Sequence, residues 1–114
     1  MELIYKIAPA ELWHQAEVKG VFSGSPVDEA DGFIHLSTSA QVRGTAARHF
    51  AGQHNLLLVG VDPKRLGAQL RYEPASGGAL FPHLYAPLKL DAVVSVRDLP
   101  LGPDGVHQLD EKFP

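Results

Sequence analysis

The chain has 114 residues, 45% of them hydrophobic, and a net charge of −3 at pH 7, which is typical of one globular domain. It has no cysteine, which excludes disulfides, thiol nucleophiles and thiolate metal sites and favours the cytoplasm. The net negative charge argues against general nucleic-acid binding, and no apolar run approaches the roughly 18 to 20 residues of a membrane helix. We therefore expect one cytoplasmic domain over residues 1–114, with an irregular tail from about residue 100.

The first half of the chain predicts two units of a strand followed by a helix. Pro9 suits the first turn of the first helix, Gly20 is a natural stop, and Ser37 or Thr38 would cap the second helix. A segment between the units is rich in turn formers and acids, which indicates an exposed loop. The expected segments are strand 3–7, helix 9–20, loop 23–32, strand 33–36 and helix 40–50.

The second half of the chain predicts mostly strands. Residues 56–61 (LLLVGV) show little polar alternation, so we expect a central strand that is covered on both faces. The other expected segments are a helical turn at 64–66 and strands at 70–73, 80–85 and 92–96. Helices come early and strands late, which favours an α+β fold with a mixed, mainly antiparallel sheet and two helices.

The first motif that could carry chemistry is FIHLST. Side chains alternate across a strand, so Phe33, His35 and Ser37 share one face, while Ile34 and Leu36 point to the core. An imidazole and a hydroxyl side by side next to an aromatic ring suit a ribose or a phosphate. The alternative is that His35 is a hydrogen-bonded core residue and Ser37 only caps a helix, and the sequence leaves both readings open.

The second motif is FPHLY, together with the RYE segment before it. Phe81, His83 and Tyr85 share a face and resemble a stacking platform for a planar base or nicotinamide, although an aromatic patch under a loop would look the same. Arg71 and Glu73 would share a face of a short strand, where Arg71 suits a phosphate and Glu73 a ribose hydroxyl or a role as base. The local sequence alone favours a solvated edge strand whose two charges pair with each other.

A metal site built from His35, His83 and Glu73 is chemically possible, since two imidazoles and a carboxylate form an open metal triad. No H-E-x-x-H or H-x-H spacing supports it, so we expect no metal. The remaining histidines show no partner pattern and are expected at the surface: His14, His49, His54 and His107. Trp13 is expected in the core of the first helix.

Several segments together resemble the domain-of-unknown-function 952 family: LIYKI, DGFIHLSTSAQV, LLLVGVDPKRL, LRYEP and FPHLYAPLKLDAVVSV. This resemblance covers nearly the whole chain before Pro100. The order of a strand, a helix, an HLS strand, a helix and an apolar strand ending in D-x-x-x-L is also distantly similar to the RNA 2′-phosphotransferases. Those enzymes belong to the ADP-ribosyltransferase superfamily, which binds NAD in the cleft of a split β-sheet.

The distant resemblance implies roles for particular residues. His35 and Ser37 would contact the ribose or nicotinamide end of NAD, and His83 with Tyr85 would lie near the superfamily's third motif. This sequence departs from the superfamily's pattern in two places. The first motif, which usually offers His or Arg, is Tyr5-Lys6 here. The carboxylate nearest the third motif is Glu73, one strand earlier than the superfamily's catalytic Glu.

The leading hypothesis is an ADP-ribosyltransferase-like domain that binds NAD or an ADP-ribose-like ligand, with transfer of ADP-ribose or phosphate as its activity. A non-catalytic module for a small ligand or a protein partner is the alternative, and a metal-dependent hydrolase is a further one. All three depend on both histidine motifs facing one cleft. The expected catalytic residues are His35, His83 and Glu73, and the expected ligand-binding residues are Ser37, Arg71, Phe81 and Tyr85.

Overall fold

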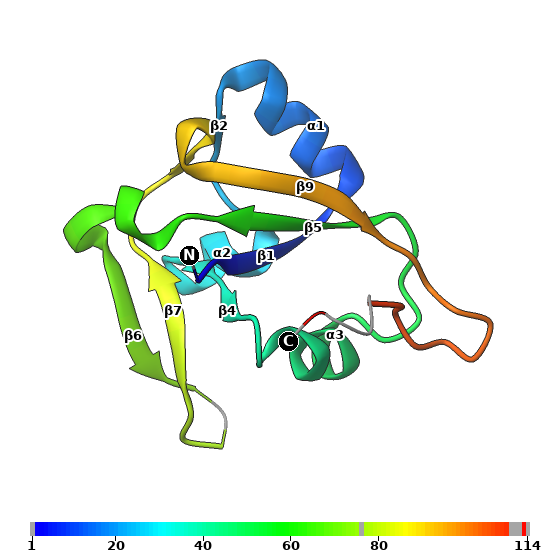
Figure 1. The fold of residues 1–114 in the computed structure, drawn as a ribbon. Helices are drawn as coiled ribbons and strands as arrows, with labels where there is room; N and C mark the ends of the chain where they lie inside the picture. Colours follow the sequence, from blue (N-terminus) through cyan, green and yellow to red (C-terminus); the bar gives the residue numbers. More distant parts are fainter. Residues whose placement is uncertain (1, 76, 110–112, 114) are drawn as a thin grey trace.

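The computed structural model of the protein describes residues 2–75, 77–109 and 113 (Figure 1). It is an α+β fold, and every strand pairing among these residues is antiparallel, where a mixed sheet was expected. The helices are α1 (Ala10–Lys19), α2 (Pro26–Asp31) and α3 (Val42–His49). The strands are β1 (Ile4–Pro9), β2 (Val21–Phe22), β3 (Ile34–His35), β4 (Ser37–Thr38), β5 (Leu56–Val61), β6 (Leu70–Pro74), β7 (Leu80–Leu84), β8 (Leu88–Lys89) and β9 (Val93–Leu99).

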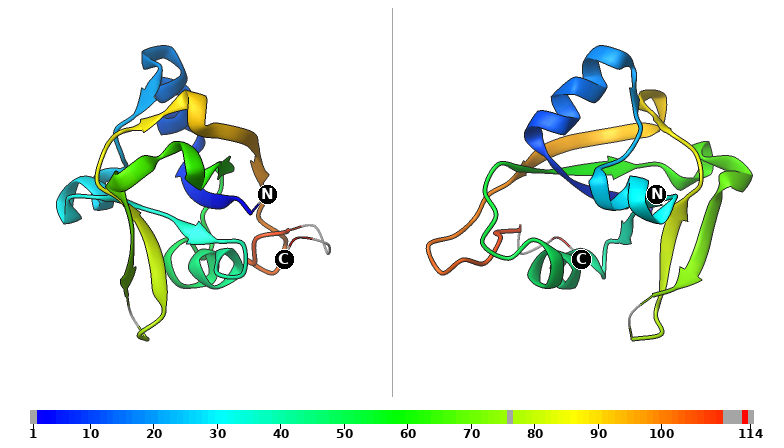
Figure 2. Two further views of the ribbon diagram at one scale, coloured as in Figure 1. Left: turned by 60° about the vertical axis from the view of Figure 1, so that its left-hand side comes forward. Right: turned by 180° about the vertical axis from the view of Figure 1, so that it is seen from behind.

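The largest sheet has the strand order β4-β1-β5-β9, and β5 lies inside it, fully buried. Leu57, Val59 and Val61 join a core cluster with Trp13 of α1. The alternate residues Leu56 and Leu58 join a second cluster with α3. Figures 1 and 2 show α1 and α3 on opposite sides of this sheet. The prediction of a central strand covered on both faces is therefore confirmed.

The first helix follows the predicted signals closely. Pro9 precedes α1, and Gly20 ends it with φ of 83°, a left-handed conformation that glycine adopts without strain. The Gly20 N–H donates to the Ala16 carbonyl at 2.8 Å. Trp13 is buried and packs against Phe22, with ring centroids 5.5 Å apart, so it belongs to the core as expected.

The prediction of an exposed loop over residues 23–32 is wrong, because α2 forms there and gives the fold a third helix. Ser25 caps α2 in a capping box: its N–H donates to Asp28 Oδ2 at 2.8 Å and its hydroxyl lies 2.9 Å from the same oxygen. Pro26 takes the first helical position, and Gly32 ends the helix at φ of 84°. The Ser-Pro-x-Asp pattern is a helix-start signal, hidden here by the many turn formers around it.

The predicted strand Phe33–Leu36 is divided between two sheets. Residues of β3 pair with β7, whereas β4 pairs with β1, and Leu36 lies at the crossing. The N–H of Leu36 donates to the Pro82 carbonyl at 3.0 Å. Because residues 37 and 38 belong to β4, neither caps α3, whose N-cap residue is Gln41. This crossing places the small sheet, β3-β7-β6, directly beside the large one.

Beyond β9 the chain returns toward α3. Leu101 and His107 form an isolated bridge, and Phe113 packs on Tyr5 with ring centroids 5.0 Å apart. His107 is buried, and its Nε2 lies 2.8 Å from the Gln53 carbonyl, so its expected place at the surface is wrong. Residues 110–112 and 114 of the predicted tail lie outside the described residues.

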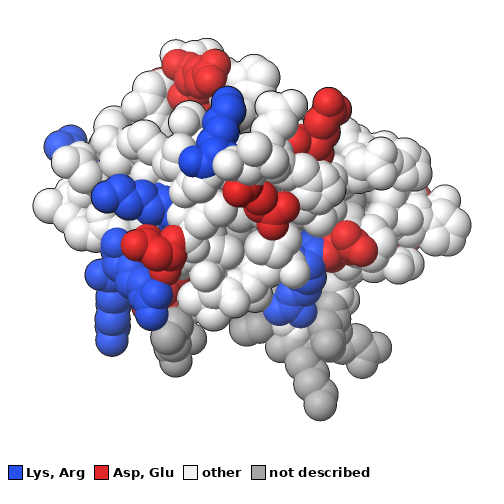
Figure 3. Space-filling model, turned by 90° about the horizontal axis from the view of Figure 1, so that it is seen from above, with Lys and Arg blue, Asp and Glu red and all other residues white. Residues whose placement is uncertain are grey.

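The surface in Figure 3 mixes both charge signs, with Asp and Glu side chains interspersed among Lys and Arg over that face. Within the described part of the chain, no helix has the length and apolar character needed to cross a membrane.

Candidate functional site

The register of the small sheet brings the two histidine motifs together. His35 of β3 is directly opposite His83 of β7, and His83 is directly opposite Arg71 of β6. Directly paired residues of antiparallel strands point to the same side of a sheet, so these three side chains form one row. The two imidazole centroids are 5.8 Å apart. His35 and His83 therefore lie side by side, as all three functional hypotheses from the sequence required.

Aromatic rings surround this row on the same face. The ring of Phe33 stacks on His83 at a centroid distance of 4.1 Å and lies 4.5 Å from His35 and 5.2 Å from Tyr85. The Arg71 guanidinium lies over the Tyr85 ring at 4.9 Å. We call this surface the histidine face and define it by six residues: Phe33, His35, Arg71, Glu73, His83 and Tyr85.

Glu73 anchors one half of the histidine face. Its Oε1 lies 2.8 Å from His83 Nδ1 and accepts a hydrogen bond from the Tyr85 hydroxyl at 2.6 Å. These bonds from Tyr85 and His83 lower the pKa of Glu73, and the same bond to Glu73 raises the pKa of Tyr85. Glu73 is therefore a carboxylate at neutral pH and orients the His83 ring. A histidine held at Nδ1 by a carboxylate is a common form of general base.

A buried ion pair anchors the other half. Lys6 Nζ lies 2.9 Å from Asp28 Oδ2, and both side chains are almost fully buried, at 4% and 1% exposure. Lys6 also donates to the His35 carbonyl at 3.1 Å, while Asp28 Oδ1 lies 2.6 Å from His35 Nδ1 and accepts from the His35 backbone N–H at 3.0 Å. Lys6 and Asp28 therefore hold His35 in place through contacts with both its ring and its backbone.

The ionisation of this pair follows from its burial and its partners. Burial lowers the pKa of Lys6, although the charge and hydrogen bond of Asp28 oppose that effect. Burial by itself would raise the pKa of Asp28, but hydrogen bonds from His35 and the charge of Lys6 together outweigh it and hold that pKa well below its usual range. Asp28 is thus a carboxylate throughout the neutral range.

Sequence reasoning did not single out Lys6 and Asp28 as functional residues. One signal was a lone lysine in the apolar strand around Ile4 and Ile7, since a buried lysine needs a carboxylate partner. The other signal was the capping pattern that begins at Ser25, which places the acid at its third helical position.

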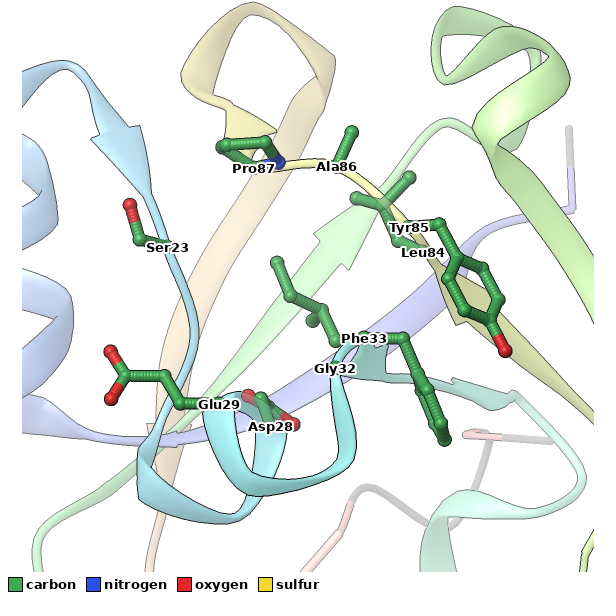
Figure 4. A pocket seen from close by; sticks show the side chains of 10 residues that line it. Ser23, Asp28, Glu29, Gly32, Phe33, Leu84, Tyr85, Ala86 and Pro87 are labelled. Carbon is green, nitrogen blue, oxygen red and sulfur yellow. The ribbon is translucent and has the colours of Figure 1, made fainter.

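An open depression of about 230 Å³ adjoins the histidine face (Figure 4). Phe33 and Tyr85 belong to both, while Ser23 and Glu29 stand on the opposite side of the depression. Asp28, Gly32, Ile34 and residues 84–87 also line the depression. This volume is large enough for one planar ring.

Ser37, which was expected to bind the ligand, lies apart from the histidine face, whereas Phe81 lies on that face without contacting the imidazoles. Ser37 is buried in β4, and its hydroxyl lies 2.9 Å from that of Thr45 in α3, so its described contact is with the helix. Phe81 is half-buried and directly opposite Glu73, so it shares the face of His83 as predicted, but the ring that contacts the imidazoles is Phe33. Among the described residues, no group of three His, Cys, Asp or Glu side chains has the arrangement of a metal site.

The family model described as "Protein of unknown function (DUF952)" matches residues 7–96, a range that holds the whole histidine face. The chain belongs to the DUF952 family. Its fold is also that of another solved protein, CC0527 from Caulobacter crescentus. The crystal structure of CC0527 is 51% identical with a TM-score of 0.89, over 93% of each chain.

Two further structures of CC0527 show the same fold. The V27M/L66M double mutant is 49% identical with a TM-score of 0.89, over 93% of each chain. The solution NMR structure is 51% identical with a TM-score of 0.84, over 93% of this chain and 91% of that one. No curated protein matches this chain significantly.

Proposed function

We propose that this DUF952 domain binds a nucleotide-like ligand, of the type of NAD or ADP-ribose, on the histidine face. The observation that carries the proposal is the direct pairing of His35 with His83 beneath the Phe33 ring. This pairing makes a surface of rings whose edges carry polar nitrogens, beside an exposed arginine. Such a surface suits a ligand that combines a planar base, a ribose and a phosphate.

Each part of such a ligand has a matching group. The guanidinium of Arg71 is exposed and held over Tyr85, which orients its fork of N–H donors for a phosphate. The open depression offers a place for a planar ring, with Phe33 and Tyr85 at its edge and Glu29 opposite to accept hydrogen bonds. The imidazole of His35, one-third exposed, is within reach of a ribose or phosphate oxygen.

The separation of the sheet β3-β7-β6 from the larger sheet β4-β1-β5-β9 supports the ADP-ribosyltransferase type of fold, which the distant resemblance implied. One departure from the superfamily changes the expected contacts. By the distant resemblance Lys6 would correspond to the first motif, but it is buried and paired with Asp28. In our proposal the polar contact from this side of the cleft therefore comes from His35. Ser37 has no part in it, because its hydroxyl is paired with Thr45 inside the fold.

A transferase and a non-catalytic binding module are both compatible with this site, and the burial of His83 distinguishes between them. A transferase would use His83, oriented by Glu73, to take a proton from the acceptor. However, His83 is only 7% exposed and lies under the Phe33 ring. That burial favours the second candidate, a non-catalytic binding module. Incubation with NAD distinguishes them: release of nicotinamide that is lost in His83→Asn would establish transfer or hydrolysis, and no release would favour the module.

Calorimetric titration with NAD and with ADP-ribose tests binding. We expect saturable binding that Arg71→Gln weakens about tenfold, which corresponds to the loss of one charge-assisted hydrogen-bonded contact of roughly 1.4 kcal/mol. Arg48→Gln is the matched control, because Arg48 is an exposed arginine on α3, outside the histidine face. Folded wild-type protein that binds neither compound would contradict the proposal, as would equal loss in the two variants.

A further inference from the structure

The imidazole of His35 has two carboxylate partners of very different character. Its Nδ1 lies 2.6 Å from Asp28, which is 1% exposed and also held by Lys6 and Ser25. Its Nε2 lies 2.9 Å from Asp31 Oδ2, whose side chain is 49% exposed at the last residue of α2. One nitrogen is therefore fixed inside the fold, and the other faces solvent with an exposed carboxylate against it.

The two contacts differ in how readily they can be exchanged. Breaking the inner contact would leave the Asp28 carboxylate buried with fewer partners, which is strongly unfavourable. The outer contact is an exposed pair, which water can replace at little cost. The imidazole can donate to both carboxylates only when both of its nitrogens carry hydrogen. In that state its outer N–H is a donor to whichever anion lies there.

We propose that His35 Nε2 is an oxyanion subsite, that Asp31 fills it in the ligand-free protein, and that a phosphate oxygen of the ligand displaces Asp31. This inference rests on the proposed function and adds the chemical class of the group that binds at His35. The Phe33 ring lies 4.5 Å from the same imidazole. A phosphate at Nε2 therefore belongs to a ligand whose base or ribose contacts that ring. Asp31 acts as a built-in competitor that weakens the binding of every anion at this position.

Removal of the competitor tests the inference. Asp31→Asn keeps the shape of the side chain and removes its charge. It should tighten the binding of ADP-ribose and of inorganic pyrophosphate roughly two- to fivefold, the range expected for an exposed ion pair. Asp98→Asn is the control, because Asp98 is an exposed aspartate on β9 of the other sheet and its loss changes the net charge equally. It should leave both affinities unchanged.

A second arm shows whether the effect acts through His35. In the double variant Asp31→Asn with His35→Gln, the gain should vanish, because the imidazole N–H for which Asp31 competes has been removed. Side-chain ¹H–¹⁵N NMR of the single variant gives an independent readout that needs no second substitution. Pyrophosphate should shift the His35 Nε2 resonance while leaving the signals of the exposed His14 and His54 in place.

The outcomes separate this inference from the proposed function. If ADP-ribose binds to the wild-type protein but Asp31→Asn binds it no more tightly than Asp98→Asn does, the subsite is wrong and the proposed function stands. If the wild-type protein does not bind ADP-ribose while Asp31→Asn binds pyrophosphate at His35, the subsite stands and the proposed function fails. Pyrophosphate binding to Asp31→Asn without a shift at His35 Nε2 would overturn the subsite.

Discussion

His35 and His83 occupy directly opposite positions on β3 and β7, with their ring centroids 5.8 Å apart and their planes at 67°. Each ring is oriented at Nδ1 by its own carboxylate, Asp28 for His35 and Glu73 for His83. The two carboxylates come from different elements, α2 and β6. A substitution in either anchor should therefore disturb one imidazole and leave the other in place.

The buried pair of Lys6 and Asp28 should be necessary for stability. Lys6→Met keeps the length of the side chain but leaves the Asp28 carboxylate buried without its cation. We expect the free energy of unfolding in urea to fall by about 3 kcal/mol, the usual result of breaking a buried pair. Lys89→Met, at an exposed position on β8, is the control and should change it little. Equal losses in both variants would contradict this role of Lys6.

Stability should fall at acid pH because of Asp28. Its pKa in the folded protein is well below its usual range, so the folded protein binds fewer protons at this carboxyl than the unfolded chain does. The resulting stabilisation is complete above the unfolded pKa of about 3.9 and is lost as the pH falls below it. Urea unfolding between pH 3 and pH 6 should show a steeper loss for the wild-type protein than for Asp28→Asn. Parallel curves would show that Asp28 does not carry this dependence.

The hydroxyl of Tyr85 should control the ionisation of Glu73. Its hydrogen bond is the largest cause that lowers the Glu73 pKa, followed by the bond from His83. Tyr85→Phe should therefore raise the Glu73 pKa toward its ordinary value, as measured by NMR titration of the side-chain carboxyl carbon. Tyr72→Phe removes a hydroxyl from an exposed neighbour and serves as the control. A Glu73 pKa that is the same in both variants would be inconsistent with the geometry.

Ser37 should affect stability and not ligand binding. Its buried hydroxyl pairs with Thr45 at 2.9 Å. Ser37→Ala should lower the free energy of unfolding by about 1 kcal/mol, as is usual for one buried hydrogen bond. The affinity for ADP-ribose should be unchanged. A loss of affinity without a loss of stability would restore the ligand-binding role that the sequence suggested for Ser37.

The sequence predicted the strongly patterned elements well. The run at residues 56–61 coincides with β5, and Gly20 ends α1 as expected, while Pro9 precedes the helix as its N-cap residue and does not lie in its first turn. These signals are local. An apolar run without polar alternation has to be buried on both faces. Proline restricts the backbone and glycine permits left-handed conformations at any position in the chain. The face shared by Phe33 and His35 was also predictable, since alternation along a strand is local too.

The rest depended on long-range pairing. Nothing near Leu36 reveals that the chain leaves one sheet there and enters another, because that depends on where β1 and β7 lie. The change of sheet turned Ser37 toward α3, so its alternation with His35 was misleading. The partnership of Lys6 with Asp28 joins residues that are far apart in the chain. The local sequence around Asp28 predicts a solvated loop, whereas in the structure this acid lies in α2.

An NMR titration with ADP-ribose, observing backbone and histidine side-chain signals, shows directly whether the histidine face binds a nucleotide. We expect saturable shifts of the His35 and His83 rings and of the backbone of Phe33, Arg71 and Tyr85, while α3 and the exposed His54 stay unaffected. Saturable shifts confined to α3 and the residues after Leu99, or no shifts in folded protein, would contradict the proposed function.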